Sequence, residues 1–246
     1  MSTQETTGSV ELAPERSTKD RLVRFAIRYG FLIVMAALFV MFGLINPVFW
    51  RPANLFSILL ASTIYGILAL GVTFPLVIDG LDLSIGSVAA LSVMISAYMM
   101  VVMELPGWLT IIVVLGLGAL VGLINGILIV RVKIPDLLAT LGMMFLVQGL
   151  QLIPSGGRSI GRGAVLEGGV TAQGAFAEYF LWLGQGRILG VVPVAVLIML
   201  FVALGVFVTL SLTRCGRVCY GIGNNSQAAR LVCAKLKPYR MMWYVM

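Results

Sequence analysis

Two carboxylates interrupt the apolar part of this sequence. Asp79 and Asp82 occur in the segment Asp79-Gly80-Leu81-Asp82-Leu83-Ser84, which has long apolar runs on both sides. A carboxylate at membrane depth costs on the order of 3 kcal/mol, so it tends to face a cavity or a partner instead of lipid. Carboxylate oxygens accept hydrogen bonds, and the hydroxyls of a sugar or polyol donate them. The segment therefore indicates hydrogen-bonding chemistry inside a membrane.

Two interpretations of this segment are open. In the first, Gly80 loosens the backbone, the helix breaks, and the acids line a polar path, as discontinuous helices do in transporters. In the second, the acids are structural: Asp82 caps the helix that begins near Ser84, and both carboxylates lie at the level of the lipid headgroups.

Motifs of the common catalytic and nucleotide-binding sites are absent from the sequence. It lacks G-x-x-x-x-G-K-[ST], H-E-x-x-H and G-x-S-x-G, and Gly221-x-Gly223 follows no strand. There is no histidine, and three cysteines without histidine do not suit a zinc site. We expect that this chain is not an enzyme and binds no metal or cofactor. If ATP drives its activity, another subunit binds the nucleotide and its Mg²⁺.

Composition indicates a membrane protein. Of the 246 residues, 60% are hydrophobic and 11% charged, and the mean hydropathy is +1.04, whereas soluble domains are roughly a quarter charged. The net charge of +7 does not indicate nucleic acid, because Lys and Arg at the membrane edge account for it. We predict an all-α polytopic membrane protein.

Six apolar runs are each about long enough to cross the roughly 30 Å hydrocarbon core as a helix. They are residues 29–45, 57–78, 84–103, 110–130, 137–153 and 188–212. With the N-terminus inside, thirteen of the seventeen Lys and Arg residues lie on the cytoplasmic side, as the positive-inside rule requires. The predicted parts are a disordered basic tail (1–27), a six-span domain (28–212) with a break near 79–84 and a long outer connection (154–186), a cytoplasmic loop (213–240), and the start of a seventh span (241–246).

The basic loop has a pattern of its own. The sequence predicts a turn over Gly221–Asn225, followed by a short amphipathic helix from Ser226 with an apolar stripe that includes Ala228 and Ala229. Such a helix on the cytoplasmic side can dock a soluble partner. The alternative is an ordinary basic loop held by anionic lipid.

Three glycines repeat every four residues on the fourth run: Gly118, Gly122 and Gly126. Small residues at this spacing share one helix face and let two helix backbones approach closely. Packing inside one subunit is favoured over a dimer interface.

Three blocks of the sequence resemble bacterial ATP-binding-cassette sugar-importer permeases of the ribose permease type. Residues 71–92, GVTFPLVIDGLDLSIGSVAALS, resemble the block G-M-T-x-V-I-x-x-G-G-I-D-L-S-V-G-S. Residues 122–160 resemble the next block, with matches at Asn125, Gly126, Ile134, Pro135, Thr140, Leu141, Gly142 and Met143. Residues 216–246 resemble the basic loop, with matches at Gly216, Arg217, Tyr220, Ile222, Gly223, Asn225, Ala228 and Ala229.

The resemblance implies a function and partners. Two permease subunits, alike or different, pair with an ATPase in the bacterial inner membrane, and a periplasmic binding protein delivers the sugar. The loop of residues 216–237 would carry the coupling helix that contacts the ATPase, through Gly216, Arg217, Tyr220, Gly223, Asn225, Ala228 and Ala229. The substrate path would include Asp79, Asp82, Ser84 and Asn125.

The sequence also departs from the family pattern. Asp79 replaces a family glycine, Val232-Cys233-Ala234 replace a Gly-Ile pair, and family members continue through further spans where this chain stops. A fragment, a frameshift product, half of a split permease and a subunit that binds the ATPase without transporting are all compatible with this ending. A permease for branched-chain amino acids is a further alternative. A membrane-embedded enzyme is disfavoured, because the apolar runs of this chain hold few polar residues that could act in catalysis.

Overall fold

The computed structural model describes residues 18–166, 169–188, 190, 192–224 and 236–245. The chain divides into two compact units, Met1–Leu55 and Phe56–Met246. The predicted helix from Ser226, with Asn225, Ala228 and Ala229, and most of the predicted N-terminal tail lie outside the described residues.

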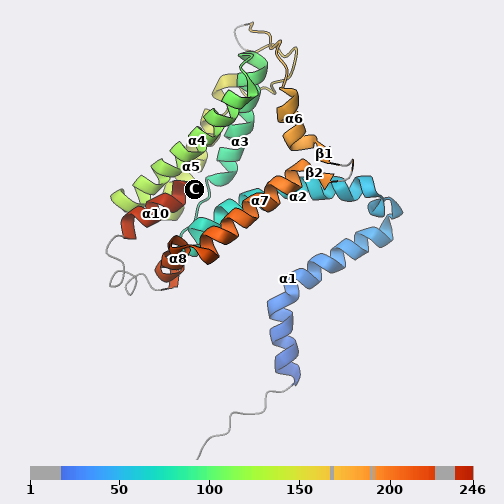
Figure 1. The fold of residues 1–246 in the computed structure, drawn as a ribbon, viewed down its shortest axis with the longest axis vertical. Helices are drawn as coiled ribbons and strands as arrows, with labels where there is room; N and C mark the ends of the chain where they lie inside the picture. Colours follow the sequence, from blue (N-terminus) through green and yellow to red (C-terminus); the bar gives the residue numbers. More distant parts are fainter. Residues whose placement is uncertain (1–17, 167–168, 189, 191, 225–235, 246) are drawn as a thin grey trace, which may run out of the picture. The chain divides into compact units, whose positions relative to one another are not determined.

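In the first unit, a long helix is followed by a short aromatic turn. Helix α1 spans Thr18–Ile45, and the 3-10 helix η1 spans Pro47–Trp50 (Figure 1). Asn46 caps η1, because its side-chain oxygen accepts the Val48 N–H at 3.0 Å. The Trp50 indole N–H donates to the Gly43 carbonyl at 3.1 Å, and its ring packs on Gly43 where a Cβ would have no room. Trp50 thus combines a hydrogen bond from its indole N–H with an apolar contact of its ring, as aromatic residues at a membrane interface do.

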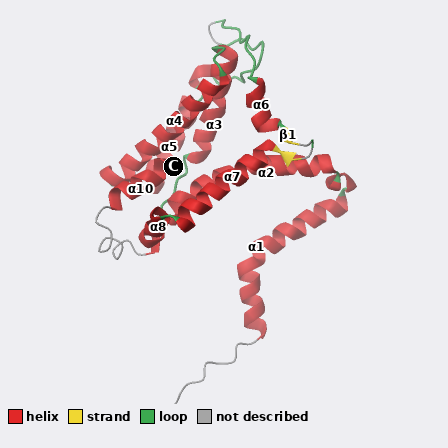
Figure 2. Ribbon diagram, viewed as in Figure 1, coloured by secondary structure: helices red, strands yellow, loops and turns green. Residues whose placement is uncertain are grey.

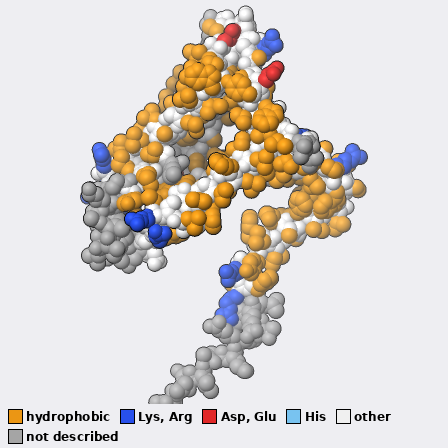
Figure 3. All heavy atoms as spheres, viewed as in Figure 1, with side chains coloured by type: hydrophobic (Ala, Val, Ile, Leu, Met, Phe, Trp, Pro, Cys, Tyr) orange, Lys and Arg blue, Asp and Glu red, His pale blue; other side chains and the backbone are white. Residues whose placement is uncertain are grey.

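Six of the described helices are long and apolar enough to cross a membrane, which confirms an all-α polytopic membrane protein. After α1 they are α2 (Pro52–Val77), α3 (Ile85–Ala97) with η2 (Tyr98–Val102), α4 (Gly107–Ile127) with η3 (Leu128–Val132), α5 (Asp136–Leu150) with η4 (Ile153–Ser155), and α7 (Val194–Phe207) with η5 (Val208–Leu212). Helix predominates among the drawn elements (Figure 2), and hydrophobic side chains run along the helices while Lys and Arg lie near their ends (Figure 3).

The start of the sixth span was predicted wrongly at Ile188. Two short strands, β1 (Arg187–Ile188) and β2 (Val192–Pro193), pair antiparallel there, and Pro193 is the N-cap of α7, which begins at Val194. Apolarity extends through both elements, so the hydropathy pattern did not separate them; the proline marks the boundary.

The outer connection predicted over 154–186 is a folded segment. It contains helix α6 (Glu178–Gln185) and a small core in which Met100 and Val101 of η2 contact Ala172. The Tyr179 hydroxyl accepts the Trp108 N–H at 2.7 Å. These contacts anchor the connection to the ends of α3 and α4.

The three repeating glycines of α4 face neighbouring helices of the same chain. Helix α10 (Leu236–Val245) lies along α4 (Figure 1). A Cβ on Gly122 would collide with the Tyr244 carbonyl, and one on Gly126 would lie 3.3 Å from Met241. A Cβ on Gly118 would instead lie 3.8 Å from Cγ1 of Val88 on α3. One face of α4 is therefore directed at two helices, α10 and α3.

A core cluster joins α2, α7 and α10 to helix α8 (Arg214–Asn224). Its buried members are Phe74, Ile78, Val206, Leu210, Cys219, Ile222, Trp243 and Tyr244. The predicted turn at Gly221–Asn225 is wrong as far as Asn224, because those residues are helical. Gly216, Cys219 and Ile222 recur every three residues and bury one helix face, and this burial outweighs the low helix propensity of glycine.

We expect Gly122→Ala to separate α10 from α4 and to lower the free energy of unfolding by about 1–3 kcal/mol, because the methyl group meets backbone. Thermal unfolding of the purified chain in detergent measures the change. Gly116→Ala is the matched control on the same helix, since nothing lies within 4 Å of its Cβ position. Equal stability of the two variants would contradict the α4–α10 contact.

Candidate functional site

The break between α2 and α3 begins with a left-handed residue. The Gly80 N–H donates to the Pro75 carbonyl at 2.9 Å, and the Asp79 N–H donates to the Leu76 carbonyl at 3.1 Å. This pair of bonds is the Schellman ending of a helix, which places the residue at Asp79 in the left-handed region, and its φ is +59°. Aspartate tolerates this region better than most residues.

Asp82 holds the start of α3. Its Oδ1 accepts the Ser84 N–H at 2.8 Å and the Ser84 hydroxyl at 2.6 Å. Asp82 accepts from the N-cap residue Ser84 and not from the first turn of α3, and Ser84 itself makes no side-chain capping bond. No described residue donates to the second carboxylate oxygen of Asp82, which remains available as an acceptor.

Asn125 extends this arrangement to α4. Its side-chain amide donates to the Ser84 oxygen at 2.9 Å, so Asn125, Ser84 and Asp82 form one chain of hydrogen bonds. Ser84 is 2% exposed and Asn125 is fully buried. The Asn125 Oδ1 is buried and has no partner among the described residues. Three of the four residues predicted for the substrate path, Asp82, Ser84 and Asn125, are therefore linked by hydrogen bonds. Asn125 lies 41 positions after Ser84 in the sequence.

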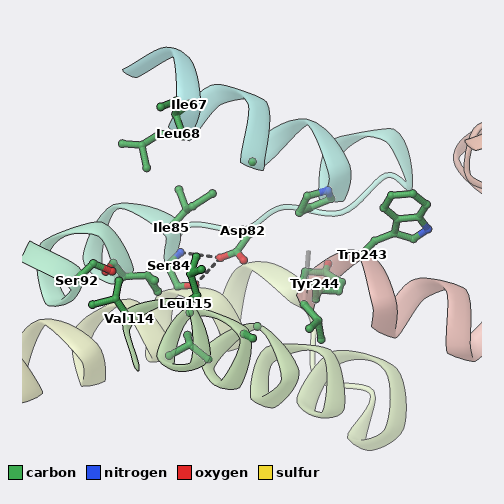
Figure 4. Close-up of a pocket in the computed structure, with 18 residues that line it drawn as sticks. Ile67, Leu68, Asp82, Ser84, Ile85, Ser92, Val114, Leu115, Trp243 and Tyr244 are labelled. Atoms are coloured by element: carbon green, nitrogen blue, oxygen red, sulfur yellow. Dashed lines mark hydrogen bonds between the residues drawn. The ribbon is translucent and has the colours of Figure 1, made fainter. Parts of the chain in front are cut away.

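A cavity of about 440 Å³ lies between α2, α3, α4 and α10, and its lining includes Asp82 and Ser84 but not Asn125. Asp82 and Ser84 stand at its wall with Tyr244 nearby (Figure 4). Much of the remaining lining is apolar: Ile67, Leu68, Ile85, Val88, Val114 and Leu115. An apolar hollow of this size with a few convergent polar groups is the usual form of a small-molecule site.

Asp79 does not line this cavity. It is exposed, and it borders a smaller pocket with Asp136 and Arg240. The structure therefore separates the two aspartates that the sequence places three residues apart.

Sequence reasoning missed two residues that hold the break in place. Asp136 opens α5, and its Oδ2 accepts the Leu81 N–H at 3.2 Å. The buried Thr140 hydroxyl donates to the Asp136 carbonyl at 2.8 Å and lies 3.5 Å from the Leu81 carbonyl. The only signal was an acid after Pro135 at a helix start. Nothing in local spacing connects it with a residue 55 positions earlier.

The residues predicted to contact an ATPase divide between two faces of α8. Gly216 packs against the Leu210 carbonyl, and Gly223 against the Val77 carbonyl at the end of α2. Arg217 and Tyr220 are exposed on the other face. The glycines thus have an internal packing role, and α8 touches the helix that leads into the break.

Comparisons with known proteins agree on one class. The family model described as "Branched-chain amino acid transport system / permease component" matches residues 54–246. The chain is 36% identical over 208 residues to the ribose import permease protein of Haemophilus influenzae, covering 85% of this chain and 61% of that protein. It is 32% identical over 213 residues to the ribose import permease protein of Escherichia coli K12, covering 87% and 63%.

A third relative is the L-arabinose transporter permease protein of Azospirillum brasilense, 32% identical over 226 residues, which cover 89% of this chain and 60% of that protein. The chain therefore spans less than two thirds of the length of these relatives. No solved structure matches the chain.

We expect Cys219 to resist alkylation in the folded chain. Burial of its side chain, which is 1% exposed, raises the pKa of the thiol to about 12, and the thiolate is the reactive form. Two variants that each keep one cysteine, Cys215 or Cys219, are treated with a maleimide before and after unfolding in detergent. Cys215, which is partly exposed, should react in both conditions, and Cys219 only after unfolding. Rapid reaction of native Cys219 would place it outside the core.

Proposed function

The chain belongs to the family of permease components described above, and on that premise we propose that it is the membrane-spanning subunit of an ATP-binding-cassette importer for a monosaccharide or related polyol. The proposal rests on one observation. Asp82 lies at the wall of a mostly apolar cavity between spans, and no described residue donates to its second carboxylate oxygen. Names of the relatives support the substrate class, since two of them are ribose permeases and one an L-arabinose permease.

In this proposal, the Asn125–Ser84–Asp82 chain orients the acceptor. Asn125 donates to Ser84, so the serine hydroxyl hydrogen points to Asp82 Oδ1. The second Asp82 oxygen then accepts from a sugar hydroxyl, and a charged acceptor makes this bond stronger than a neutral one. The apolar lining contacts the carbon face of the sugar ring.

A permease for branched-chain amino acids is the second candidate. The description of the family names that substrate, and the leucine, isoleucine and valine side chains of the cavity suit an aliphatic group. Against it, Asp82 is the only charged side chain among the described residues that line the cavity, so a substrate carboxylate would find no cation.

The proposed partners follow from the same premise. A separate ATPase subunit binds ATP and Mg²⁺, a second permease subunit completes the path, and a periplasmic binding protein delivers the sugar to the outer face of the bacterial inner membrane. This chain contacts lipid, binds no cofactor of its own and has no nucleic-acid partner. The exposed face of α8, with Arg214, Arg217 and Tyr220, is the described surface that we assign to the ATPase.

Substrate binding tests the proposal. We expect ribose, arabinose or galactose at millimolar concentration to raise the melting temperature of the chain in nanodiscs, and leucine and valine not to do so. Asp82→Asn should weaken sugar binding about tenfold, because a charge-assisted hydrogen bond is lost. Glu178→Gln, a change of the same kind in the outer connection, should bind as the unmodified chain does. Stabilisation by leucine but by none of the sugars would favour the second candidate.

Docking to the ATPase is tested by co-purification from solubilised membranes with the candidate ATPase. Arg217→Glu with Tyr220→Ala should reduce capture at least tenfold, because both side chains leave the exposed face of α8. Lys133→Glu is the control, since Lys133 is an exposed cation on the neighbouring turn after η3. An equal loss in both variants would mean that general basic charge at the membrane surface, and not α8, governs the association.

A further inference from the structure

A second, smaller pocket of about 90 Å³ lies beside the helix break. Its lining is largely polar, with Asp79, Gly80, Asp136, Arg240 and Tyr244 against two isoleucines. The pocket lies where α2 ends and α5 begins, next to the turn that carries Arg131 and Lys133. The positive-inside rule puts this end of the bundle on the cytoplasmic side.

Tyr244 borders both the cavity and this pocket. The residue is 6% exposed. Its hydroxyl lies beside Gly80, because a Cβ built on Gly80 would be 2.6 Å from that oxygen. No described residue makes a hydrogen bond with the hydroxyl. The hydroxyl oxygen is not among the fully buried polar atoms that lack a partner, so it is accessible to water or to a ligand.

The position of Tyr244 is set by its backbone. Its carbonyl packs on Gly122 of α4, and its Cβ lies 3.5 Å from the Cβ position of Gly126. The neighbouring Trp243 is stacked on Phe74 of α2, with ring centroids 5.0 Å apart. Helix α10 is therefore held between α4 and α2, and the Tyr244 ring stands as a partition between the two hollows.

We infer that Tyr244 forms the constriction of the substrate path, and that its hydroxyl hydrogen-bonds a sugar hydroxyl passing from Asp82 to the pocket of Asp79 and Asp136. The pocket has about a fifth of the cavity's volume and holds a few water molecules, not a sugar ring. A sugar therefore leaves the cavity on this side only when the Tyr244 ring moves. The nature of the passing molecule rests on the proposed function, whereas the partition itself does not.

Accessibility of a cysteine in the cavity tests the partition. Ser92 lines the cavity and not the small pocket, and Ser92→Cys changes one atom. The background carries Cys215→Ser and Cys233→Ser and keeps the buried Cys219. In inside-out vesicles, a membrane-impermeant maleimide should label Ser92→Cys slowly when residue 244 is tyrosine, and at least tenfold faster after Tyr244→Ala. Tyr244→Phe keeps the ring and should stay slow.

The same background without Ser92→Cys is the matched control, because labelling of Cys219 there would report an unpacked core. If Tyr244→Ala unpacks the core, Gly80→Ala provides the second variant. Its methyl group would displace the tyrosine hydroxyl from the opposite side while α10 stays intact, and it too should speed labelling. Equally fast labelling of Ser92→Cys with tyrosine and with alanine at position 244 overturns the partition. If alanine at position 244 unpacks the core, an unchanged labelling rate in Gly80→Ala overturns it.

Sugar protection then separates this inference from the function on which it rests. If Ser92→Cys is labelled faster in Tyr244→Ala and ribose slows that labelling, the result supports both the partition and the proposed sugar function. Ribose without effect leaves the constriction established and rejects the sugar as the passing molecule. Loss of ribose affinity in Tyr244→Phe, at an unchanged labelling rate, is the expected sign of the hydroxyl contact, and full affinity in that variant overturns it.

Discussion

The cost of placing a carboxylate inside an apolar bundle governs the centre of this molecule. Asp82 stands at a cavity wall between spans, where an ionised group needs donors that lipid does not offer. Ser84 supplies two donors to one of its oxygens, and Asn125 in turn holds the Ser84 hydroxyl. The start of α3 and the last turn of α4 are therefore joined through the hydrogen bonds that satisfy one charge. The same arrangement leaves the second oxygen of Asp82 as an acceptor toward the cavity.

The break itself depends on support from a different part of the chain. Residues 80–83 belong to no helix, so helical hydrogen bonds do not satisfy the peptide groups around Leu81. Asp136 accepts the Leu81 N–H, and Thr140 approaches its carbonyl, so α5 replaces the bonds that a continuous helix would have made. Discontinuous helices inside membranes are tolerated where other protein groups satisfy their backbone. The position of the break and the start of α5 are in this way one structural unit.

Close helix approach links this unit to the basic end of the chain. Gly122 admits the backbone of α10, and Gly223 admits the end of α2 against α8. Phe74, Ile78, Cys219, Ile222, Trp243 and Tyr244 then form one buried cluster. Gly223 of α8 therefore lies against Val77, the last residue of α2, two residues before Asp79. This connection gives the exposed face of α8 a physical route to the cavity in the proposed importer.

The sequence by itself determined the membrane class, six spans and their approximate limits, because span length and apolarity are local properties that the thickness of the bilayer sets. It also indicated that Gly118, Gly122 and Gly126 share one face of α4, because helical spacing is a local property. Only the tertiary structure decided that α8 is helical through Gly223 and that α7 begins at Val194, because burial and strand pairing compete there with local propensity. It alone joined Asp136 to Leu81 and placed Tyr244 between two hollows. Such contacts join residues far apart in the chain, and their free energy depends on a fold that no local pattern records.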